Sequence, residues 1–449
     1  MKNPRGTILL FITLLVSWRG RGAEFNVDPS GHHLLLKGKP FFWLADTVWL
    51  LAQLPSRDEL EVYLGAREKQ GFTVIQLTAV MSEERVWGST RTNIFGQKPF
   101  LNDDPATPAV TPGNNPHDPA QYDYWDHLDY VLERVHAHGF RAAVVAMFVG
   151  WRVDGYKHLK KENALQYGRF LGERYRSKPQ IIWIVGGDNT PDTQDKKEVW
   201  NLVAKGITEG TCGKEDYTQT LMTYHINGGA SSSLIWHYSP WLDFNMAQTW
   251  SEYKDIYGML QRDYLKTPSK PCGLGEGAYE DGPQYPTKPI DDLVVRKQAY
   301  WSYFAGGYHT YGNGNVWHFN SFKEESTQPW KDALYSAGAR NLIFLRKFFD
   351  KVDWSRFIPD QHLLAGFEAS GISQNCAMRT PQNDAFIFYV TSTNQITLSL
   401  GASSGSSSLS AKWVNPATGE ERRVEKFSGD QAKILVPSGW ADALLYLRK

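Results

Sequence analysis

Residues 138–145 have the sequence HGFRAAVV, and residues 70–77 have the similar sequence QGFTVIQL. In both places an amphipathic run ends at a glycine, and a short apolar run follows at once. Glycine just after the last helical turn is a common helix end, and a bounded apolar run is typical of a buried strand. The two junctions therefore predict helices that lead directly into strands of a parallel sheet.

The same unit recurs along most of the chain. Apolar and amphipathic runs alternate to about residue 350, and Ser56 with Glu59 predicts a capped helix start. Eight such units in about 330 residues fit a (β/α)8 TIM barrel with inserted loops, the longest over residues 81–121. The expected strands lie at residues 41–49, 72–80, 141–149, 180–185, 221–225, 244–249, 271–276 and 308–311. The expected helices after the first lie at residues 122–138, 163–176, 196–209, 252–265, 291–305 and 333–351.

From about Gly366 the chain consists of short alternating runs separated by Gly, Ser, Asn and Pro. This pattern predicts a small antiparallel β-sandwich, with residues 401–408 (GASSGSSS) as a turn between two strands. The expected organisation is a signal peptide at residues 1–23, a catalytic barrel at 24–355 and a C-terminal β-sandwich domain at 360–449. The expected sandwich strands lie at residues 385–390, 396–400, 409–414, 433–436 and 443–447.

The N-terminus has the pattern of an export signal. A basic start is followed by an apolar run from Thr7 to Trp18 and then by the small residue Ala23. The run is too short to span a bilayer. We expect a secreted or periplasmic protein that does not associate with a membrane once the signal peptide is cleaved. The sequence leaves the cleavage site open.

The amino-acid composition argues against some classes of function. The chain has 48 basic and 48 acidic residues and a pI near 7.2, which argues against a nucleic-acid partner. Its 17 Trp and 22 Tyr suit either a large core or the flat faces of sugar rings. The three cysteines match no metal motif and exclude a disulfide framework, although a single Cys212–Cys272 bridge stays open.

Two strand ends carry an acid next to glycines. In a TIM barrel the chemistry lies at the carboxyl ends of the strands. The fourth expected strand ends in IVGGDN, with Asp188, and the seventh in LGEGAYE, with Glu276 and Glu280. Strands four and seven face each other across the ring, so two carboxylates can approach one scissile bond, as in glycoside hydrolysis. Taken singly, Asp188 fits a helix N-cap equally well, and Glu280 fits a surface loop.

Other polar and aromatic residues at the strand ends are candidate substrate contacts. The indoles are candidate stacking platforms, and the polar groups are candidate hydroxyl binders or satisfied polar groups of the barrel. The candidates are Trp49, Trp151, Trp250 and Trp317 for stacking, and Asp46, Gln76, Asn189, His225, Gln248, Tyr279, Glu280 and Tyr311 for polar contacts.

Four stretches resemble the apiosidase-like glycoside hydrolases, a family of exported bacterial (β/α)8 proteins. They are FWLADTVWLL (42–51), WLDFNMAQTW (241–250), PCGLGEGAYE (271–280) and GGYHTYGNGNVW (306–317). The stretch WVNPATGE (413–420) resembles the Asn-Pro-x-Thr-Gly turn of the small collagen-binding-type β-domain that usually follows.

The resemblance implies a retaining hydrolase that acts on pectin side chains of the plant cell wall. It assigns Asp188 as acid/base and Glu276 or Glu280 as nucleophile, and the strand end favours Glu276. Family barrels often place Asn before the acid, whereas Asn189 follows Asp188 here, so the contact to the sugar 2-hydroxyl stays unassigned.

Other functions remain alternatives. They are a non-catalytic carbohydrate-binding protein and a matrix-adhesion protein acting through the C-terminal domain. No cofactor is expected, and no metal, because His32-His33 and His136-x-His138 have no carboxylate at ligand spacing. The sequence leaves open the sugar, the linkage, exo or endo action and the oligomeric state.

Overall fold

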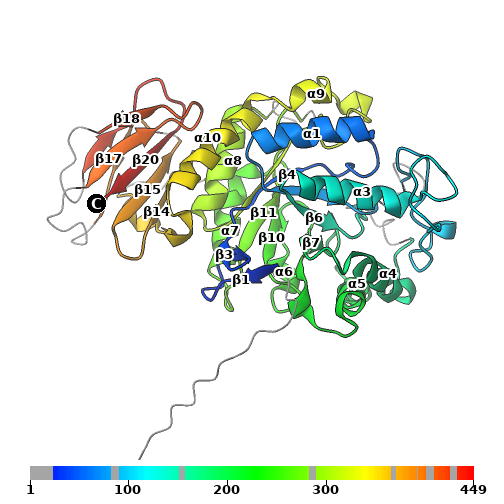
Figure 1. Ribbon diagram of the computed structural model, residues 1–449. Helices are drawn as coiled ribbons and strands as arrows, with labels where there is room; N and C mark the ends of the chain where they lie inside the picture. Colours follow the sequence, from blue (N-terminus) through cyan, green and yellow to red (C-terminus); the bar gives the residue numbers. More distant parts are fainter. Residues whose placement is uncertain are drawn as a thin grey trace, which may run out of the picture.

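The computed structural model describes residues 24–81, 91–150, 157–282, 290–365, 371–391, 393–400, 409–424 and 432–449. Figure 1 shows a barrel surrounded by helices and, at its left, a β-domain that lies beside helices α8 and α10. The expected signal peptide (residues 1–23), Trp151 and the turn at residues 401–408 lie outside the described residues. In the described part of the chain, no helix is long and apolar enough to cross a membrane.

All eight expected barrel strands are present, so the predicted (β/α)8 class is confirmed. Six form one parallel sheet in the order β12-β4-β5-β6-β7-β8, and β10 pairs in parallel with β11. A single bridge between Gly273 and Tyr308 joins β11 to β12, and the Asp243 amide donates to the Met222 carbonyl between β8 and β10. The eight strands therefore surround the barrel axis, but the hydrogen-bonded ladder is interrupted between β8 and β10 and between β11 and β12. The strands are β4 (Leu44–Thr47), β5 (Val74–Thr78), β6 (Arg141–Val145), β7 (Ile181–Ile184), β8 (Leu221–Thr223), β10 (Asn245–Gln248), β11 (Cys272–Glu276) and β12 (His309–Gly312), with β9 (Ala230–Ser231) antiparallel to β10.

The helices follow the expected order with shifted ends. Ser56 and Glu59 form the predicted capping box at the start of α1. The expected helix at 252–265 begins with a 3-10 turn at Tyr253–Asp255, and the one at 333–351 begins only at Ala337, after a separate short helix at Trp330–Ala333. The helices are α1 (Arg57–Lys69), α3 (Tyr124–Ala137), α4 (Lys161–Tyr175), α5 (Gln194–Cys212), α6 (Ser233–Trp236), α7 (Ile256–Tyr264), α8 (Asp292–Phe304), α9 (Trp330–Ala333) and α10 (Ala337–Lys351).

The alternation of side chains along each strand produces two apolar layers. Residues such as Ala45, Val145 and Ile184 form the core inside the barrel, and a larger core lies between the strands and the helices. An N-terminal antiparallel meander, which the sequence did not predict, packs against the inner core. Its Leu34 amide donates to the Tyr308 hydroxyl at 2.6 Å. The meander is β1 (Phe25–Val27), β2 (Leu34–Leu36) and β3 (Lys39–Pro40).

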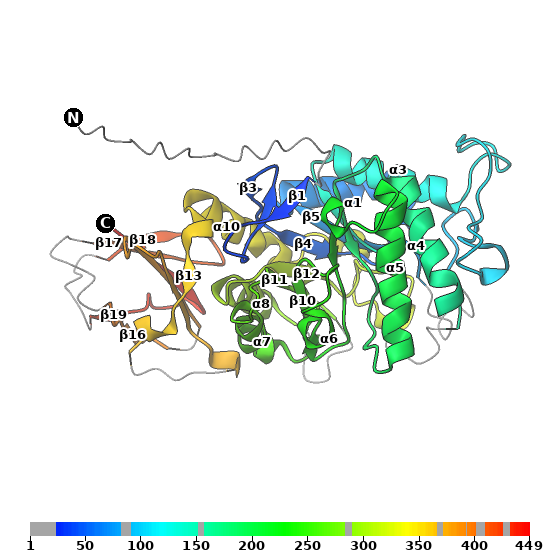
Figure 2. The ribbon, with the colours of Figure 1, turned by 90° about the horizontal axis from the view of Figure 1, so that it is seen from below.

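Helices α4 and α5 lie in backbone contact (Figure 2). A Cβ added at Gly168 would stand 2.3 Å from the Val203 carbonyl oxygen, and one at Gly172 would stand 2.1 Å from that of Ile207. On the other helix, Gly206 and Gly210 face α4 in the same way. Only glycine permits this approach, because any side chain would collide with backbone atoms that cannot move independently.

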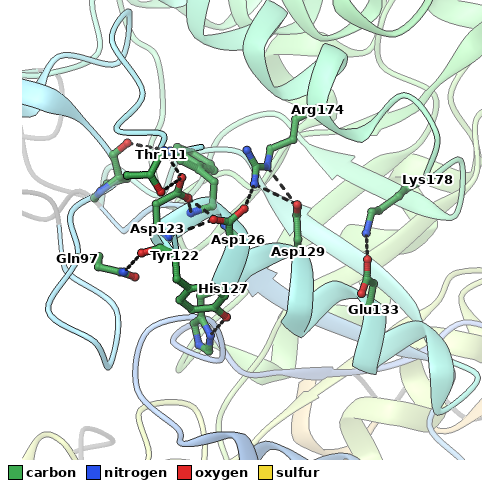
Figure 3. Close-up of polar contacts among 12 residues, drawn as sticks. Gln97, Thr111, Tyr122, Asp123, Asp126, His127, Asp129, Glu133, Arg174 and Lys178 are labelled. Carbon is green, nitrogen blue, oxygen red and sulfur yellow. Dashed lines mark hydrogen bonds and ion pairs between the residues drawn. The ribbon is translucent and has the colours of Figure 1, made fainter. Parts of the chain in front are cut away.

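Buried and half-buried polar contacts anchor the long loop before α3 (Figure 3). The Asp123 carboxylate caps α3 by accepting from the Trp125 and Asp126 amides, and it also accepts from the Thr111 amide at 2.7 Å. Arg174 of α4 then binds Asp126 at 2.8 Å. The loop is thus tied through α3 to the next helix.

The C-terminal domain has two layers of antiparallel strands, as expected. A six-stranded sheet (β13-β14-β15-β20-β17-β18) faces the barrel, and the pair β16-β19 covers its other face. The sequence missed β13, β14 and β18, and β18 is Glu-Arg-Arg, which has no apolar alternation. The strands are β13 (Ile358–Pro359), β14 (Cys376–Arg379), β15 (Ala385–Val390), β16 (Gln395–Thr397), β17 (Ser410–Val414), β18 (Glu421–Arg423), β19 (Lys433–Leu435) and β20 (Ala443–Arg448).

The cysteines form no bridge. Cys212, Cys272 and Cys376 are all free, which settles the alternative left open by their spacing. Cys272 and Cys376 are buried, and burial raises the pKa of both thiols well above the usual value.

Candidate active site

A cavity of about 530 Å³ opens at the carboxyl ends of the barrel strands. Its walls come from the ends of several strands and from the loop after β12, the arrangement that the barrel fold provides for catalysis. Seven of the candidate residues line it: Trp49, Asp188, Gln248, Trp250, Glu276, Tyr279 and Trp317. The other lining residues are Met81, Phe148, Asn227, Gly228, Phe322 and Glu325.

Glu276 is the last residue of β11 and is 8% exposed. Its Oε1 accepts a hydrogen bond of 2.5 Å from the Tyr279 hydroxyl. Its Oε2 lies 3.2 Å from Nε2 of His225, a contact distance without the alignment of a hydrogen bond. Each carboxylate oxygen thus has a polar neighbour that fixes its direction.

The glycines on either side of Glu276 are required by close packing inside the protein. A Cβ at Gly275 would stand 2.4 Å from Met246 Cγ, and a Cβ at Gly277 would stand 2.4 Å from Gln298 Oε1. The glycines therefore make room for neighbouring side chains of the barrel rather than for a ligand.

Asp188 follows β7 with a backbone conformation that is unusual for a residue with a side chain. Its φ is 48°, in the left-handed region, and its amide donates to Nδ1 of His225 at 3.3 Å. Trp250, also on the cavity wall, has φ 46°. Such strained residues persist only where the surroundings enforce them, and they concentrate at functional sites. Gly187, just before Asp188, packs closely against Phe148, because a Cβ at this position would stand 2.8 Å from the Phe148 ring.

Asp188, His225 and Glu276 converge. One side-chain atom from each lies within 4.8 Å of the others, so a carboxylate oxygen of Asp188 approaches one of Glu276 to within that distance. Three such groups can in principle hold a metal ion. However, Nδ1 of His225 already accepts the Asp188 amide, so the neutral imidazole carries its proton on Nε2, beside Glu276. This tautomer has no free lone pair for a metal.

Aromatic rings and unpartnered polar atoms complete the cavity. The Trp49 ring is tilted against Phe148 and forms a T-shaped pair with His225, whereas Trp250 is 42% exposed. Buried polar atoms of three lining residues have no hydrogen-bond partner among the described residues: Asn227 Oδ1, Gln248 Oε1 and Trp317 Nε1. A buried polar group without a partner is unfavourable, so these atoms are well suited to sugar hydroxyls.

Four candidates belong to the barrel framework instead. Asp46 is fully buried and binds Arg67 at 2.6 Å and the Tyr63 hydroxyl at 2.7 Å. Gln76 is also buried and donates to the Gly275 carbonyl at 2.8 Å. These positions correct the expectation that Asp46 and Gln76 contact substrate.

Glu280 and Tyr311 are the other two framework residues. The Glu280 carboxylate accepts from the Gly338 and Ala339 amides at the start of α10 and from the Tyr311 hydroxyl at 2.6 Å. Glu280 is 2% exposed, and burial raises its pKa to about 7. Neither residue lines the 530 Å³ cavity, which leaves Glu276 as the candidate carboxylate beside Asp188.

Asn189 and His225 lie next to the cavity rather than on its wall. Asn189 is 5% exposed and donates to the Gly150 carbonyl at 3.3 Å. Sequence reasoning missed Phe322 and Glu325, because they come from a loop well beyond the end of β12. Phe148 and Asn227 stand at strand ends, the signal that would have found them.

The barrel and the cavity at its carboxyl end define a glycoside hydrolase-like catalytic fold. The chain belongs to the family "Apiosidase-like, catalytic domain", whose model matches residues 29–356. Residues 358–444 match the model "Putative collagen-binding domain of a collagenase". Both matches agree with the resemblance seen in the sequence.

Solved structures support the same class. The chain is similar to a glycoside hydrolase family 5 protein from Bacteroides vulgatus, with 26% identity, a TM-score of 0.81 and coverage of 95% of this chain and 92% of the other. It is also similar to a protein described as a glycoside hydrolase, with 27% identity, a TM-score of 0.81 and coverage of 96% and 97%. No curated protein matches the chain.

Proposed function

We propose that this protein is an exported, retaining glycosidase that acts on pectin-type polysaccharide. The observation that carries the proposal is the approach of the Asp188 and Glu276 carboxylates to within 4.8 Å. Retaining enzymes hold their two carboxyl groups about 5 Å apart, whereas inverting enzymes need about 6.5–9.5 Å for a water molecule. The N-terminal apolar run and the family support export and the substrate class.

In the proposed mechanism Glu276 attacks the anomeric carbon while Asp188 protonates the leaving oxygen. The Tyr279 hydroxyl and His225 orient the Glu276 carboxylate toward the cavity. Asp188 then takes a proton from the water that hydrolyses the glycosyl-enzyme. The reaction needs one protonated and one ionised carboxyl group, a state that the closeness of two acids favours.

The cavity favours an uncharged sugar at the reacting position. Among the described residues that line it, the charged side chains are Asp188, Glu276 and Glu325, and all three are acidic. A uronate carboxylate would be repelled there. Trp49, Trp250 and Trp317 supply faces for the ring, and Asn227 and Gln248 supply acceptors for its hydroxyls.

Two variants and a framework control test the proposal. Glu276→Gln should abolish turnover while sugar binding stays measurable, whereas Glu280→Gln should keep turnover at a pH where the variant is folded. Asp188→Asn should lose activity on natural linkages but still cleave a substrate with an activated leaving group, which needs no acid. Product anomers followed by NMR should show retention. Turnover by Glu276→Gln would contradict the assignment.

The same measurements separate the alternatives. A carbohydrate-binding protein would bind oligosaccharides without releasing products. A metal-dependent hydrolase would lose activity on treatment with a chelator, and the proposed two-carboxylate enzyme would not.

A further inference from the structure

A second cavity, of about 570 Å³, lies where the end of α10 meets the C-terminal sheet. We call it the junction cleft. Lys351 comes from α10, and strands β17, β18 and β20 contribute the facing wall. Its charged lining residues are Lys351, Lys412, Glu421, Arg423 and Arg448, and Tyr446 lines it beside them.

The junction cleft collects positive charge that the chain as a whole does not have. Four cationic side chains and one acid line it, in a protein with equal numbers of both. Glu421 binds Lys412 at 2.9 Å and Lys351 at 3.4 Å. Arg423 and Arg448 form no ion pair with any described residue, although Arg448 contacts the Tyr446 hydroxyl.

Glu421 balances only part of this charge, because it pairs with Lys412 and Lys351 and leaves Arg423 and Arg448 without an acidic partner among the described residues. Lys412 of β17 stands directly opposite Arg423 of β18 in the strand register. Like charges in this position destabilise a sheet. Lys412 also stands opposite Tyr446 of β20, so the cations and an aromatic ring share one face of the sheet. A bound carboxylate would relieve the repulsion and accept from the guanidinium groups.

The junction cleft is separate from the catalytic cavity. Glu280, four residues after Glu276, binds the first turn of α10, and Lys351 is the last residue of that helix. A helix of 15 residues is roughly 22 Å long at 1.5 Å per residue. The two cavities share no lining residue, and only the C-terminal end of α10 lines the junction cleft.

We propose that the junction cleft binds the carboxylates of a uronate-bearing glycan and anchors the polymer during hydrolysis. The idea rests on the proposed function and extends it, because the catalytic cavity is lined by acids and suits an uncharged sugar. Uncharged side chains of the polymer enter the catalytic cavity, and its anionic backbone occupies the junction cleft. The ring of Tyr446 favours a sugar over a phosphate-only polyanion.

The test is calorimetric binding of long oligogalacturonate to the full-length protein, compared with the same glycan after its carboxyl groups are reduced. Arg423→Gln/Arg448→Gln should weaken binding of the acidic glycan about tenfold. The control Arg422→Gln/Lys433→Gln removes two cations from the same domain outside the cleft and should change binding less than about twofold. Lys351→Gln, on the opposite wall, should weaken binding even if the double variant folds poorly.

Each outcome decides the question. Binding of the reduced glycan, equal loss in the control variant, or no binding at all would overturn the proposal. Equal affinity for polyphosphate or RNA would also overturn it and indicate a general polyanion site. Turnover of a short uncharged substrate, measured in parallel, reports on the catalytic site alone and should be the same in wild type and in Arg423→Gln/Arg448→Gln.

Discussion

The imidazole Nε2 of His225 lies 3.2 Å from Oε2 of Glu276. The other ring nitrogen accepts the amide of Asp188, so one side chain contacts both proposed catalytic residues. His225 is fully buried, and its ring packs against Trp49 in a T-shaped pair and against Phe148 in a tilted pair. We expect His225→Ala to lower kcat about 100-fold with little change in KM, because a small displacement of a reacting carboxylate is costly.

His225→Gln provides the internal comparison. Its amide can reach Glu276 but cannot replace the ring contact with the Asp188 amide, so kcat should lie between that of wild type and His225→Ala. Steady-state kinetics on one defined oligosaccharide checks both variants. An unchanged kcat in His225→Ala would show that the ring does not position either acid.

The Tyr279 hydroxyl makes the shortest polar contact to Glu276. Tyr279→Phe removes this donor and keeps the ring that packs against Gly312. Loss of one hydrogen bond to an ionised group is worth about 1.5–3 kcal/mol, so kcat should fall at least about tenfold. The thermal midpoint, measured in parallel, should shift by only a few degrees. A large loss of stability with unchanged kcat would assign Tyr279 to the framework.

Sequence could place acids at strand ends but could not say which way each side chain points. Asp46 follows Ala45, which faces the inside of the barrel, so Asp46 points outward to Arg67 of α1. Tyr311 likewise lies in the outer layer, against Phe72. Alternation along a strand of four residues, with ends uncertain by one or two, leaves this choice open.

Features built from residues far apart in the sequence could not be predicted either, because they leave no local pattern. The junction cleft joins α10 with residues about 60 to 100 positions later, and a charge pattern without local periodicity gives no signal. This cluster of cations on the C-terminal domain could therefore not be predicted from the sequence. The strand order of the barrel, in contrast, followed from local junctions such as Gly71 and Gly139.

The contact between α4 and α5 predicts a severe effect of a single methyl group. Gly172→Ala would bring Cβ to 2.1 Å from the Ile207 carbonyl oxygen, so the helices must separate. We expect a loss of at least about 2 kcal/mol in the free energy of unfolding. Gly65→Ala in α1 is the matched control, because a Cβ there meets nothing within 4 Å, and it should gain up to about 1 kcal/mol. Urea denaturation of both variants decides between these outcomes.

The buried Glu280 predicts a pH-dependent stability. Burial raises its pKa from 4.5 to about 7, so its contribution is fully present below about pH 4.5 and is lost as pH rises through 7. The loss has an upper limit of about 3 kcal/mol. Glu280→Gln lacks this titration and should be less pH-dependent than wild type between pH 5 and 8. Asp243, whose pKa burial raises to about 7, titrates in both proteins and cancels in the comparison.

The exposed Glu162→Gln is the control for this prediction, because removal of a solvated carboxylate should leave the wild-type pH dependence in place. Urea unfolding at pH 5 and pH 8 gives both slopes. If Glu280→Gln and wild type lose the same stability over this range, the Glu280 carboxyl group does not titrate there.

The β-domain is joined to the barrel by a buried ion pair, and this contact predicts that the two unfold together. Arg296 of α8 donates to both oxygens of Asp442, which also accepts from the Tyr389 hydroxyl at 2.9 Å. Asp442→Ala leaves Arg296 buried with Asp292 as its one acidic partner in the described part of the chain, so the free energy of unfolding should fall by about 3 kcal/mol. Arg296→Met/Asp442→Leu removes both charges and should cost less than Asp442→Ala, because no buried charge is left without its partner. Calorimetry should show one unfolding transition in wild type and a separate, earlier transition of the β-domain in Asp442→Ala. If both variants lose the same free energy of unfolding, apolar packing, and not the ion pair, holds the β-domain to the barrel.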